Sequence, residues 1–143
     1  MRFSTKTRYG IRTMIEIAMA DAEGGILQKD ISKNQEISNK YLDQIILALK
    51  ASELICNVKG KKSGYILTRK PAEITVYDIH NSFEPGICVI ECMAKTSHCL
   101  KAKECKVYGF WFDLNEKITD HFKSTTLLDL IHSGSIENNK SRC

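Results

Sequence analysis

Two short helical patterns joined by a tight turn, with a glycine-bounded hairpin directly after them, limit the fold of this chain more than any other feature. The first helix is predicted over 29–34, with Ile31 facing inward. The second is predicted over 38–50, where Ser38 can cap the N-terminus because its hydroxyl can accept from an otherwise unpaired backbone N–H. Its apolar side chains recur on one stripe: Leu42, Ile45, Ile46 and Leu49. This pattern predicts a helix-turn-helix.

The residues after the second helix predict a β-hairpin. Two short strands are expected over 54–59 and 65–67, and the tip between them is basic and bounded by Gly60 and Gly64. A further helix is predicted over 7–22 and is closed by Gly24-Gly25. A helix-turn-helix with a basic hairpin next to it predicts a winged helix.

Side chains that suit DNA lie on the polar face of the 38–50 helix. Gln44 suits adenine, Asp43 can accept from a cytosine amino group, and Lys40 can meet guanine or phosphate. The hairpin carries three cations that suit phosphates or the minor groove: Lys59, Lys61 and Lys62. The alternative is an ordinary solvated surface, because a net charge of +4 is compatible with nucleic acid without demonstrating it.

The C-terminal half predicts a long amphipathic helix. Thr75 and Asp78 form a capping-box-like start of a shorter helix, which Glu84-Pro85-Gly86 breaks. The long helix is expected over 107–123, with a broad hydrophobic seam: Val107, Phe110, Trp111, Leu114, Ile118 and Phe122. This seam exceeds what a small domain can cover, so we expect it to pack against a second copy of the chain. Thr126 and Asp129 predict the cap of a short final helix.

Cys92, Cys99 and Cys105 are spaced C-x6-C-x5-C in a polar, lysine-rich segment. Thiolates at such spacing can converge on one soft metal centre, and the residues alone leave three readings open. These are an iron–sulfur cluster, zinc bound by three thiolates and an imidazole such as His98, or free thiols in a protein without a cluster. His98 and Glu104 are candidates for a fourth ligand, although either can be a solvated loop residue.

The remaining cysteines and histidines are given structural roles or none. Cys88 is expected to be a packed thiol because Val89 and Ile90 beside it are apolar, and Cys56 on a hairpin strand is expected to be structural. Cys143 is expected to be an idle tail thiol. Three histidines lie on predicted helices and receive no role: His80, His121 and His132.

The N-terminus has no signal-peptide pattern, and no stretch approaches the run of about 18 apolar residues that a membrane span needs. We therefore expect a cytoplasmic protein that does not enter the membrane, in a compartment where thiols stay reduced. Paired carboxylates, a nucleophile–base motif and a phosphate-binding loop are not evident in the sequence, which argues against an enzyme.

The sequence resembles the Rrf-two (Rrf2) family of bacterial and archaeal winged-helix regulators, which includes IscR, NsrR and CymR. The likeness covers residues 1 to about 130 and lies in six motifs: Lys6-x-Arg8-Tyr9, Asp30-Ile31-Ser32, Ile37-Ser38-x-x-Tyr41-Leu42-x-Gln44, Val58-Lys59-Gly60, Gly64-Tyr65-x-Leu67 and Trp111-x-Asp113-Leu114. The three cysteines stand where cluster-binding members have theirs, so the IscR-like branch matches best.

This resemblance implies a recognition helix and a wing that contact a two-fold related DNA operator. The residues it places on them are Ser38, Lys40, Tyr41, Asp43 and Gln44 on the helix, and Lys59, Gly60, Lys61 and Lys62 on the wing. The chain departs from the family at the tip, where Lys61-Lys62-Ser63 replaces a more glycine-rich sequence and Lys59 stands where arginine is common. Lysine lacks the planar fork of arginine, so it anchors phosphate without bidentate reading.

The resemblance also implies a 2Fe–2S cluster at Cys92, Cys99 and Cys105, with 4Fe–4S as the alternative that some members hold. We expect that aerobic preparation of this protein can remove the cluster. Relatives complete the cluster with a histidine or with a carboxylate from the partner's first helix, but Tyr108 and Arg8 stand at those positions here. The fourth ligand is therefore left open between His98 and Glu104.

The predicted fold is mainly α-helical with a small β-hairpin: a winged helix-turn-helix DNA-binding domain plus a long C-terminal dimerisation helix. We expect the DNA-binding domain over 1–84, a cysteine-rich cluster-binding loop over 85–106, the dimerisation helix and short final helix over 107–132, and a disordered tail over 133–143. The predicted function is that of a homodimeric transcription regulator that senses iron–sulfur, redox or nitric oxide status. The alternatives are a cluster-free, CymR-like regulator that responds to a partner or to thiol oxidation, and an iron–sulfur protein that does not bind DNA.

Overall fold

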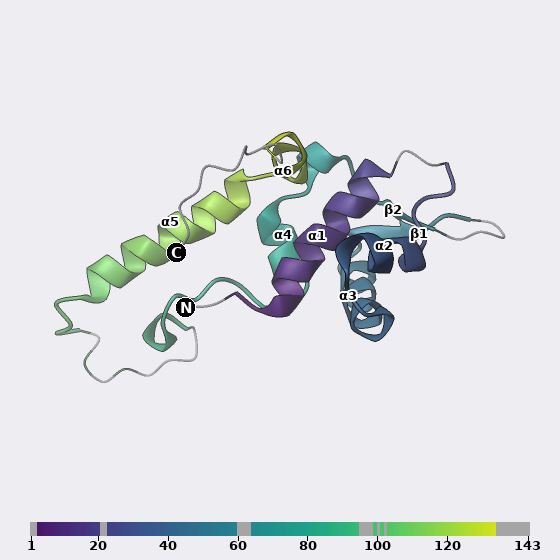
Figure 1. The fold of residues 1–143 in the computed structure, drawn as a ribbon. Coiled ribbons are helices and arrows are strands. Elements are labelled where there is room, and N and C mark those ends of the chain that lie inside the picture. The colour runs from purple at the N-terminus through teal and green to yellow at the C-terminus, as the bar shows by residue number, and fades with distance from the viewer. Residues whose placement is uncertain are drawn as a thin grey trace, which may run out of the picture.

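The described part of the chain folds mainly into helices, with an antiparallel hairpin at one edge, as the sequence predicts for a winged helix (Figure 1). The computed structural model describes residues 3–20, 23–59, 64–94, 99, 101 and 103–133. The elements follow in the order α1 (Thr5–Met19), α2 (Gln28–Gln35), α3 (Asn39–Ala51), β1 (Ile55–Asn57), β2 (Tyr65–Leu67), η1 (Pro71–Glu73), α4 (Val76–Asn81), η2 (Glu91–Met93), α5 (Tyr108–Ser124) and α6 (Leu127–Ser133).

The core lies where α1, α2, α3 and the hairpin meet. All four apolar residues of the predicted stripe on α3 are buried, and Met14 of α1 and Ile31 of α2 pack against them. Ser38 caps α3 as expected, because its Oγ accepts from the Tyr41 N–H at 3.3 Å. The stripe therefore fixes which face of α3 points inward and leaves its polar face outward.

Side chains of α1 hold the C-terminal end of α2. Arg12 donates from Nε to the Gln35 side-chain oxygen at 2.7 Å, and Glu16 accepts from Asn34 at 3.0 Å. Glu36 then turns the chain with a φ of 54°, in the left-handed region that few residues other than glycine adopt. These contacts set the angle at which α3 leaves the turn.

The hairpin is joined to the segment before α2. Its strands pair Ile55 with Leu67 and Asn57 with Tyr65. On the other edge of β2, Tyr65 exchanges backbone hydrogen bonds with Ile26, at 2.8 and 3.1 Å. This approach needs Gly64, since a Cβ there would lie 2.4 Å from the Gly24 carbonyl oxygen.

The short helix α6 returns to the winged-helix body. The Leu127 N–H donates to the Ile74 carbonyl at 2.8 Å, and the Leu127 side chain is fully buried in the core. Thr126 and Asp129 form the predicted cap, and hydrogen bonds from the Thr126 hydroxyl and N–H lower the pKa of the Asp129 carboxyl below its usual value. The sequence grouped this helix with the dimerisation helix, whereas the structure packs it against α1 and η1.

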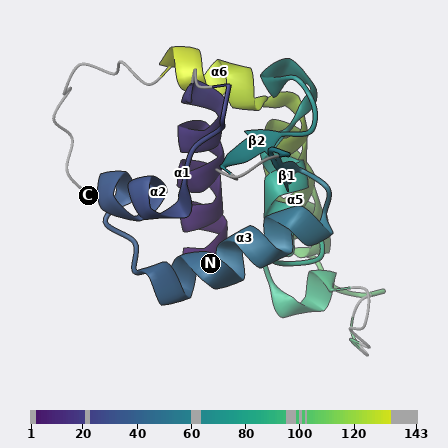
Figure 2. The same cartoon turned by 90° about the vertical axis from the view of Figure 1, so that its right-hand side faces the viewer.

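Helix α5 extends away from the body (Figures 1 and 2). It contacts α4, and of its two ends the C-terminal one lies closer to α4. Only Thr119 among its residues is buried. Among the helices that the structure describes, none is long and apolar enough to cross a membrane.

Helix α1 differs from its predicted bounds. It begins at Thr5, and it ends at Met19 because Ala20 takes an extended conformation, four residues before Gly24. The capping box of Thr75 and Asp78 at the start of α4 is confirmed. Apart from Ser133, the predicted tail over 133–143 lies outside the described residues.

Candidate DNA-binding face and cysteine segment

The polar face of α3 is open to solvent. Lys40, Asp43 and Gln44 are exposed, and they lie on the side of the helix opposite the buried stripe. Ser38 is also exposed, although its Oγ already accepts the capping hydrogen bond. The N-terminal half of α3 therefore presents hydrogen-bond donors and acceptors to solvent. In DNA-binding proteins with a helix-turn-helix, the corresponding second helix enters the major groove and its N-terminal residues contact the base edges.

Tyr41 occupies a different position from its neighbours on α3. Its side chain is half-buried, and its ring meets the Tyr9 ring edge-on at 5.6 Å between centroids. The Arg12 guanidinium lies over the Tyr9 ring, 5.3 Å from its centroid. Tyr41 thus packs α3 against α1 while one edge of its side chain remains accessible.

Asp43 is hydrogen-bonded within the chain. The Gln28 side-chain amide donates to Asp43 Oδ1 and, at 3.4 Å, to the Asn39 carbonyl. Tyr65 on β2 donates from its hydroxyl to Gln28 Oε1 at 3.4 Å. Gln28 carries no signal of its own in the sequence, and its proximity to Asp43 arises only from the packing of α2 on α3.

The hairpin strands lead to the predicted wing tip. Lys59 is exposed, and Val58 is held by a 2.9 Å hydrogen bond from its N–H to the Gly64 carbonyl. Gly60, Lys61 and Lys62 lie outside the described residues.

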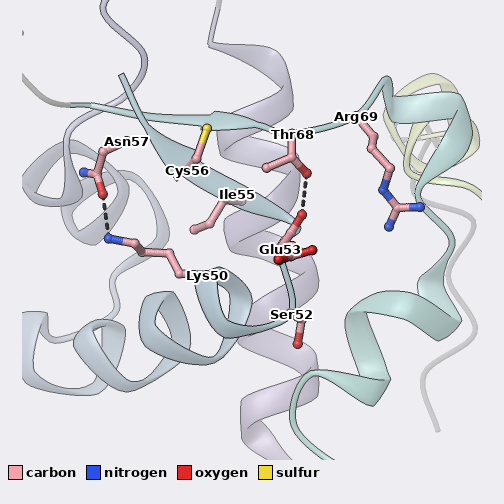
Figure 3. Close-up of a pocket in the computed structure, with 8 residues that line it drawn as sticks. All are labelled: Lys50, Ser52, Glu53, Ile55, Cys56, Asn57, Thr68 and Arg69. Carbon is pink, nitrogen blue, oxygen red and sulfur yellow. Dashed lines mark hydrogen bonds between the residues drawn. The ribbon is translucent and has the colours of Figure 1, made fainter. Parts of the chain in front are cut away.

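An open groove of about 620 Å³ lies between the C-terminal end of α3 and the base of the hairpin (Figure 3). Its two cations are engaged within the chain. Lys50 donates to the Asn57 side chain at 2.6 Å, and Arg69 donates to the Glu73 carbonyl at 3.3 Å. Cys56, for which a structural role is expected, lines the groove and is half-buried.

The three cysteines of the predicted cluster site are exposed on the segment between α4 and α5. Cys92 lies in η2, and Cys105 lies three residues before α5. Within the described ranges, no three histidine, cysteine or acidic side chains lie close enough together to hold a metal ion. The structure therefore places three solvent-facing thiols on one segment without gathering them.

The candidates for the fourth ligand are placed only in part. Glu104 is exposed beside Cys105, and His98 lies outside the described residues. Tyr108, at the position of the histidine in relatives, is the first residue of α5, and its ring stacks on Phe112 at 6.3 Å.

The expectation that Cys88 is a packed thiol is wrong. Cys88 is exposed, and its Sγ donates to the Ile90 carbonyl at 2.9 Å. The apolar neighbours Val89 and Ile90 are half-buried, and the Val89 N–H is fixed by the Asn115 side chain of α5 at 3.0 Å. Anchoring of the backbone at Val89 leaves the thiol on the outer side of the segment.

His80, which received no role in the sequence analysis, is buried where the DNA-binding half meets the cysteine segment. It is 2% exposed, Nδ1 lies 3.1 Å from the Thr7 hydroxyl of α1, and Nε2 lies 2.8 Å from the Gly86 carbonyl. Since a carbonyl only accepts, Nε2 carries the proton and the Thr7 hydroxyl donates to Nδ1. A polar residue on the inward side of the short helix α4, four residues after Val76, was the available signal.

The predicted dimerisation seam is divided between exposed and packed residues. Phe110 is 63% exposed, whereas Trp111, Leu114 and Ile118 are half-buried. Phe122 stacks on Phe3 at 4.9 Å within the same chain. Val107, at the start of the predicted seam, is exposed, and so are two large apolar side chains that the sequence analysis did not place in the seam, Tyr108 and Phe112.

Comparison with known proteins agrees with this geometry. The model of the Rrf2 family, which is described as iron-dependent transcriptional regulators, matches residues 3–133 of this chain. The chain belongs to the Rrf2 family. It is 30% identical over 138 residues to the HTH-type transcriptional regulator IscR of Pectobacterium atrosepticum, a match that covers 96% of this chain and 84% of that protein.

Two solved Rrf2 structures resemble the fold closely. CymR, the global cysteine regulator of B. subtilis, superposes with a TM-score of 0.76 at 31% identity, over 92% of this chain and 97% of CymR. T. potens IscR superposes with a TM-score of 0.74 at 27% identity, over 100% of this chain and 94% of IscR. The chain is therefore a transcriptional regulator of the Rrf2 family, and not an enzyme.

Proposed function

We propose that this chain is a homodimeric, DNA-binding regulator whose affinity for its operator changes with the state of an iron–sulfur cluster on Cys92, Cys99 and Cys105. The observation that carries the proposal is the exposed polar face of α3, set in a winged helix and joined through one segment to three exposed thiols. Such a regulator would act in the cytoplasm on a two-fold related operator.

The proposed DNA-binding residues divide into two groups by chemistry. Lys40, Asp43 and Gln44 would read base edges from the N-terminal half of α3, with Ser38 and Tyr41 beside them. The wing residues would contact the backbone or the minor groove: Lys59, Gly60, Lys61 and Lys62.

The proposed dimer forms through α5. Its N-terminal half carries Phe110, which is 63% exposed, and Phe112, which is 47% exposed, beside the half-buried Trp111. We propose that a second copy covers this surface, in an isologous contact where the same side chains meet across a two-fold axis. Leu114 and Ile118 would extend the contact, whereas Phe122 supports α5 from within the chain through Phe3.

The donor set fits a soft metal centre in its chemistry. Iron–sulfur clusters require thiolate ligands, and all three proposed ligands are accessible cysteines. A bound cluster would supply a centre that responds to redox state and nitric oxide. We propose 2Fe–2S in preference to 4Fe–4S, with His98 or Glu104 as the candidate fourth ligand.

His80 and Val89 give the cysteine segment a short physical route to the rest of the molecule. His80 joins Gly86, at the start of the segment, to Thr7 on α1, and Val89 is bound to Asn115 on α5. A change in the segment would therefore act on both the DNA-binding half and the dimer helix. Coupling between sites of this kind is typically about 1–3 kcal/mol, or about 5- to 150-fold in affinity.

Anaerobic purification tests the cluster. The expected result is visible absorption with iron and acid-labile sulfide in the wild-type protein, and loss of the absorption in Cys92→Ala, Cys99→Ala and Cys105→Ala. Cys56→Ala is the matched control, because Cys56 lies on β1 outside the segment, and it should keep the colour. Colour retained in all three variants would place the metal elsewhere.

The salt dependence of DNA binding tests the wing. Lys61→Ala and Lys62→Ala should each flatten the slope of log affinity against log salt concentration by about one unit. Lys117→Ala, on the exposed side of α5, is the control and should leave the slope unchanged. An unchanged slope in the wing variants would remove the wing from the contact surface.

A cluster-free regulator of the same fold is the second candidate, favoured by the close superposition on CymR. It would respond to a partner protein or to thiol oxidation. Anaerobic wild-type protein that binds DNA without iron or sulfide would select this candidate, and zinc in its place would indicate a zinc site. A coloured protein that binds no duplex DNA would instead indicate an iron–sulfur protein outside transcription.

A further inference from the structure

Gln28, the first residue of α2, contacts both of the elements through which the chain would grip DNA. Its side-chain Nε2 donates to Asp43 Oδ1 on the outer face of α3, and its Oε1 accepts from the Tyr65 hydroxyl on β2. The same Nε2 lies 3.4 Å from the Asn39 carbonyl, in the first turn of α3. One amide therefore uses both its donor and its acceptor to join the recognition helix to the hairpin.

The hairpin end of this connection is firmly placed. Tyr65 directly follows Gly64, the residue that closes the wing tip, and its backbone is paired with Ile26 on one side and with Asn57 on the other. Ile26 is only two residues before Gln28. A displacement of the wing would thus reach Gln28 through the Tyr65 hydroxyl and through the backbone leading into α2.

The α3 end of the connection determines how Asp43 can be used. The hydrogen bond from Gln28 is made to Oδ1 and leaves Oδ2 as the oxygen best placed to accept from a base amino group. A carboxylate fixed in this way accepts a hydrogen bond from the cytosine N4 amino group. It is repelled by guanine O6 and N7, because both of these atoms are acceptors as well. An unrestrained Asp43 would sample several rotamers, and part of its discrimination would be lost in ordering it on the DNA.

We propose that Gln28 is a positioning residue for base reading: it holds the Asp43 carboxylate in a single orientation and ties that orientation to the wing through Tyr65. The inference rests on the proposed DNA-binding function. It assigns no base contact to Gln28 itself, and it predicts that sequence preference at one base pair depends on a residue outside the recognition helix.

Fixing one side chain before binding is worth roughly a two- to tenfold change in affinity. We therefore expect removal of the Gln28 amide to reduce discrimination at the base pair read by Asp43 by roughly two- to tenfold. Affinity for unrelated duplexes should not change, because it depends on the phosphate contacts.

The test begins with selection of binding sites by the full-length protein from a pool of duplexes with a randomised central region. Fluorescence anisotropy then gives the affinity for the selected duplex, for each single-base variant of it, and for an unrelated duplex of the same length. The proteins compared are the wild type, Gln28→Met, Gln28→Glu, Asp43→Ala and the Gln28→Met/Asp43→Ala double variant. Methionine keeps the length of the side chain without its hydrogen bonds, and glutamate keeps the acceptor for Tyr65 but repels Asp43.

The expected result is reduced discrimination at one and the same base pair in Gln28→Met, Gln28→Glu and Asp43→Ala. The affinity of Gln28→Met for the unrelated duplex and its unfolding temperature should stay as in the wild type. In the double variant, the Gln28 substitution should add nothing to the loss caused by Asp43→Ala, which a merely structural role would not produce.

Unchanged base preference in Gln28→Met would overturn the inference and leave the proposed function intact. A loss that persists at full size in the Asp43→Ala background would also overturn it, because Gln28 would then act through another group. A wild-type protein that enriches no sequence and binds no duplex would remove the proposed function, and the inference with it.

Discussion

Replacement of His80 provides a sharp test of how the cysteine segment is attached to the DNA-binding half. His80 is buried, bonded at both ring nitrogens, and packed edge-on against Phe3 at 5.9 Å and Phe122 at 5.7 Å. In His80→Phe an aromatic ring of somewhat larger volume fills the site and both hydrogen bonds are lost. The Thr7 hydroxyl is itself buried, so it loses the acceptor of its proton, which water cannot easily replace, and keeps only a 3.3 Å contact with the Ser4 hydroxyl.

The magnitude follows from the groups left behind. A buried donor without a partner costs about 1–3 kcal/mol, and the Gly86 carbonyl can recover a partner from solvent because Gly86 is only half-buried. We therefore expect His80→Phe to lower the free energy of unfolding by about 1–3 kcal/mol. His80→Ala also removes the ring from between two phenylalanines, so the loss should reach about 3–5 kcal/mol.

Urea denaturation at one fixed protein concentration measures these values, because dimerisation would make the stability depend on concentration. Hydrogen exchange at residues 86–89 provides a second readout: exchange there should accelerate in both variants, since the Gly86 carbonyl loses its hydrogen bond to His80 and only the Gly86 N–H, bound to the Asn81 side chain, still holds this residue to α4. His121→Ala is the control, as His121 is exposed on α5. A free energy of unfolding within about 0.5 kcal/mol of the wild type for both His80 variants would refute this reasoning.

Three further substitutions test single local features. Thr13→Val should raise the free energy of unfolding by about 1 kcal/mol in urea denaturation, because the Thr13 hydroxyl is buried and has no hydrogen-bond partner in the described part of the chain; a decrease would reveal a partner. Glu53→Gly should also raise the free energy of unfolding by about 1 kcal/mol, because Glu53, which follows α3, has a φ of 57° in the left-handed region that glycine adopts without strain. A urea midpoint below that of the wild type would show that no strain is relieved there. The pKa of Asp129 is lowered, so its carboxylate stabilises the folded chain at pH values above the usual carboxyl pKa of 3.8, and this contribution is lost as the pH falls below that value. Asp129→Asn should therefore remove this part of the pH dependence of the unfolding temperature between about pH 6 and 2. An identical pH profile in the variant and the wild type would contradict this prediction.

Local patterns in the sequence predict the elements of this fold well. The stripe from Leu42 to Leu49, the Ser38 cap and the capping box of Thr75 and Asp78 are confirmed, because each depends on residues within one helix turn or a few turns of each other. The family and its regulatory class are also confirmed, because their motifs extend over almost the whole chain.

Contacts between remote segments could not be predicted in the same way. His80 meets Thr7 across 73 residues, and Gln28 meets Tyr65 across 37, so neither pair leaves a periodic signal. The prediction that Cys88 is a packed thiol was wrong for a related reason. Its backbone neighbour Val89 is bound by Asn115 of α5, 26 residues away, and the thiol donates to the Ile90 carbonyl and stays exposed. The proposed ligands, DNA contacts and dimer seam stay predictions.

The stoichiometry of the protein–DNA complex tests the central claim most directly. Sedimentation of a fluorescent duplex carrying the selected site, titrated with anaerobically purified protein, should give a complex of two chains per duplex, and free protein of twice the mass of one chain. A single chain that sediments alone and leaves the duplex unshifted would contradict the claim that α3 and α5 together build a two-fold DNA-binding regulator.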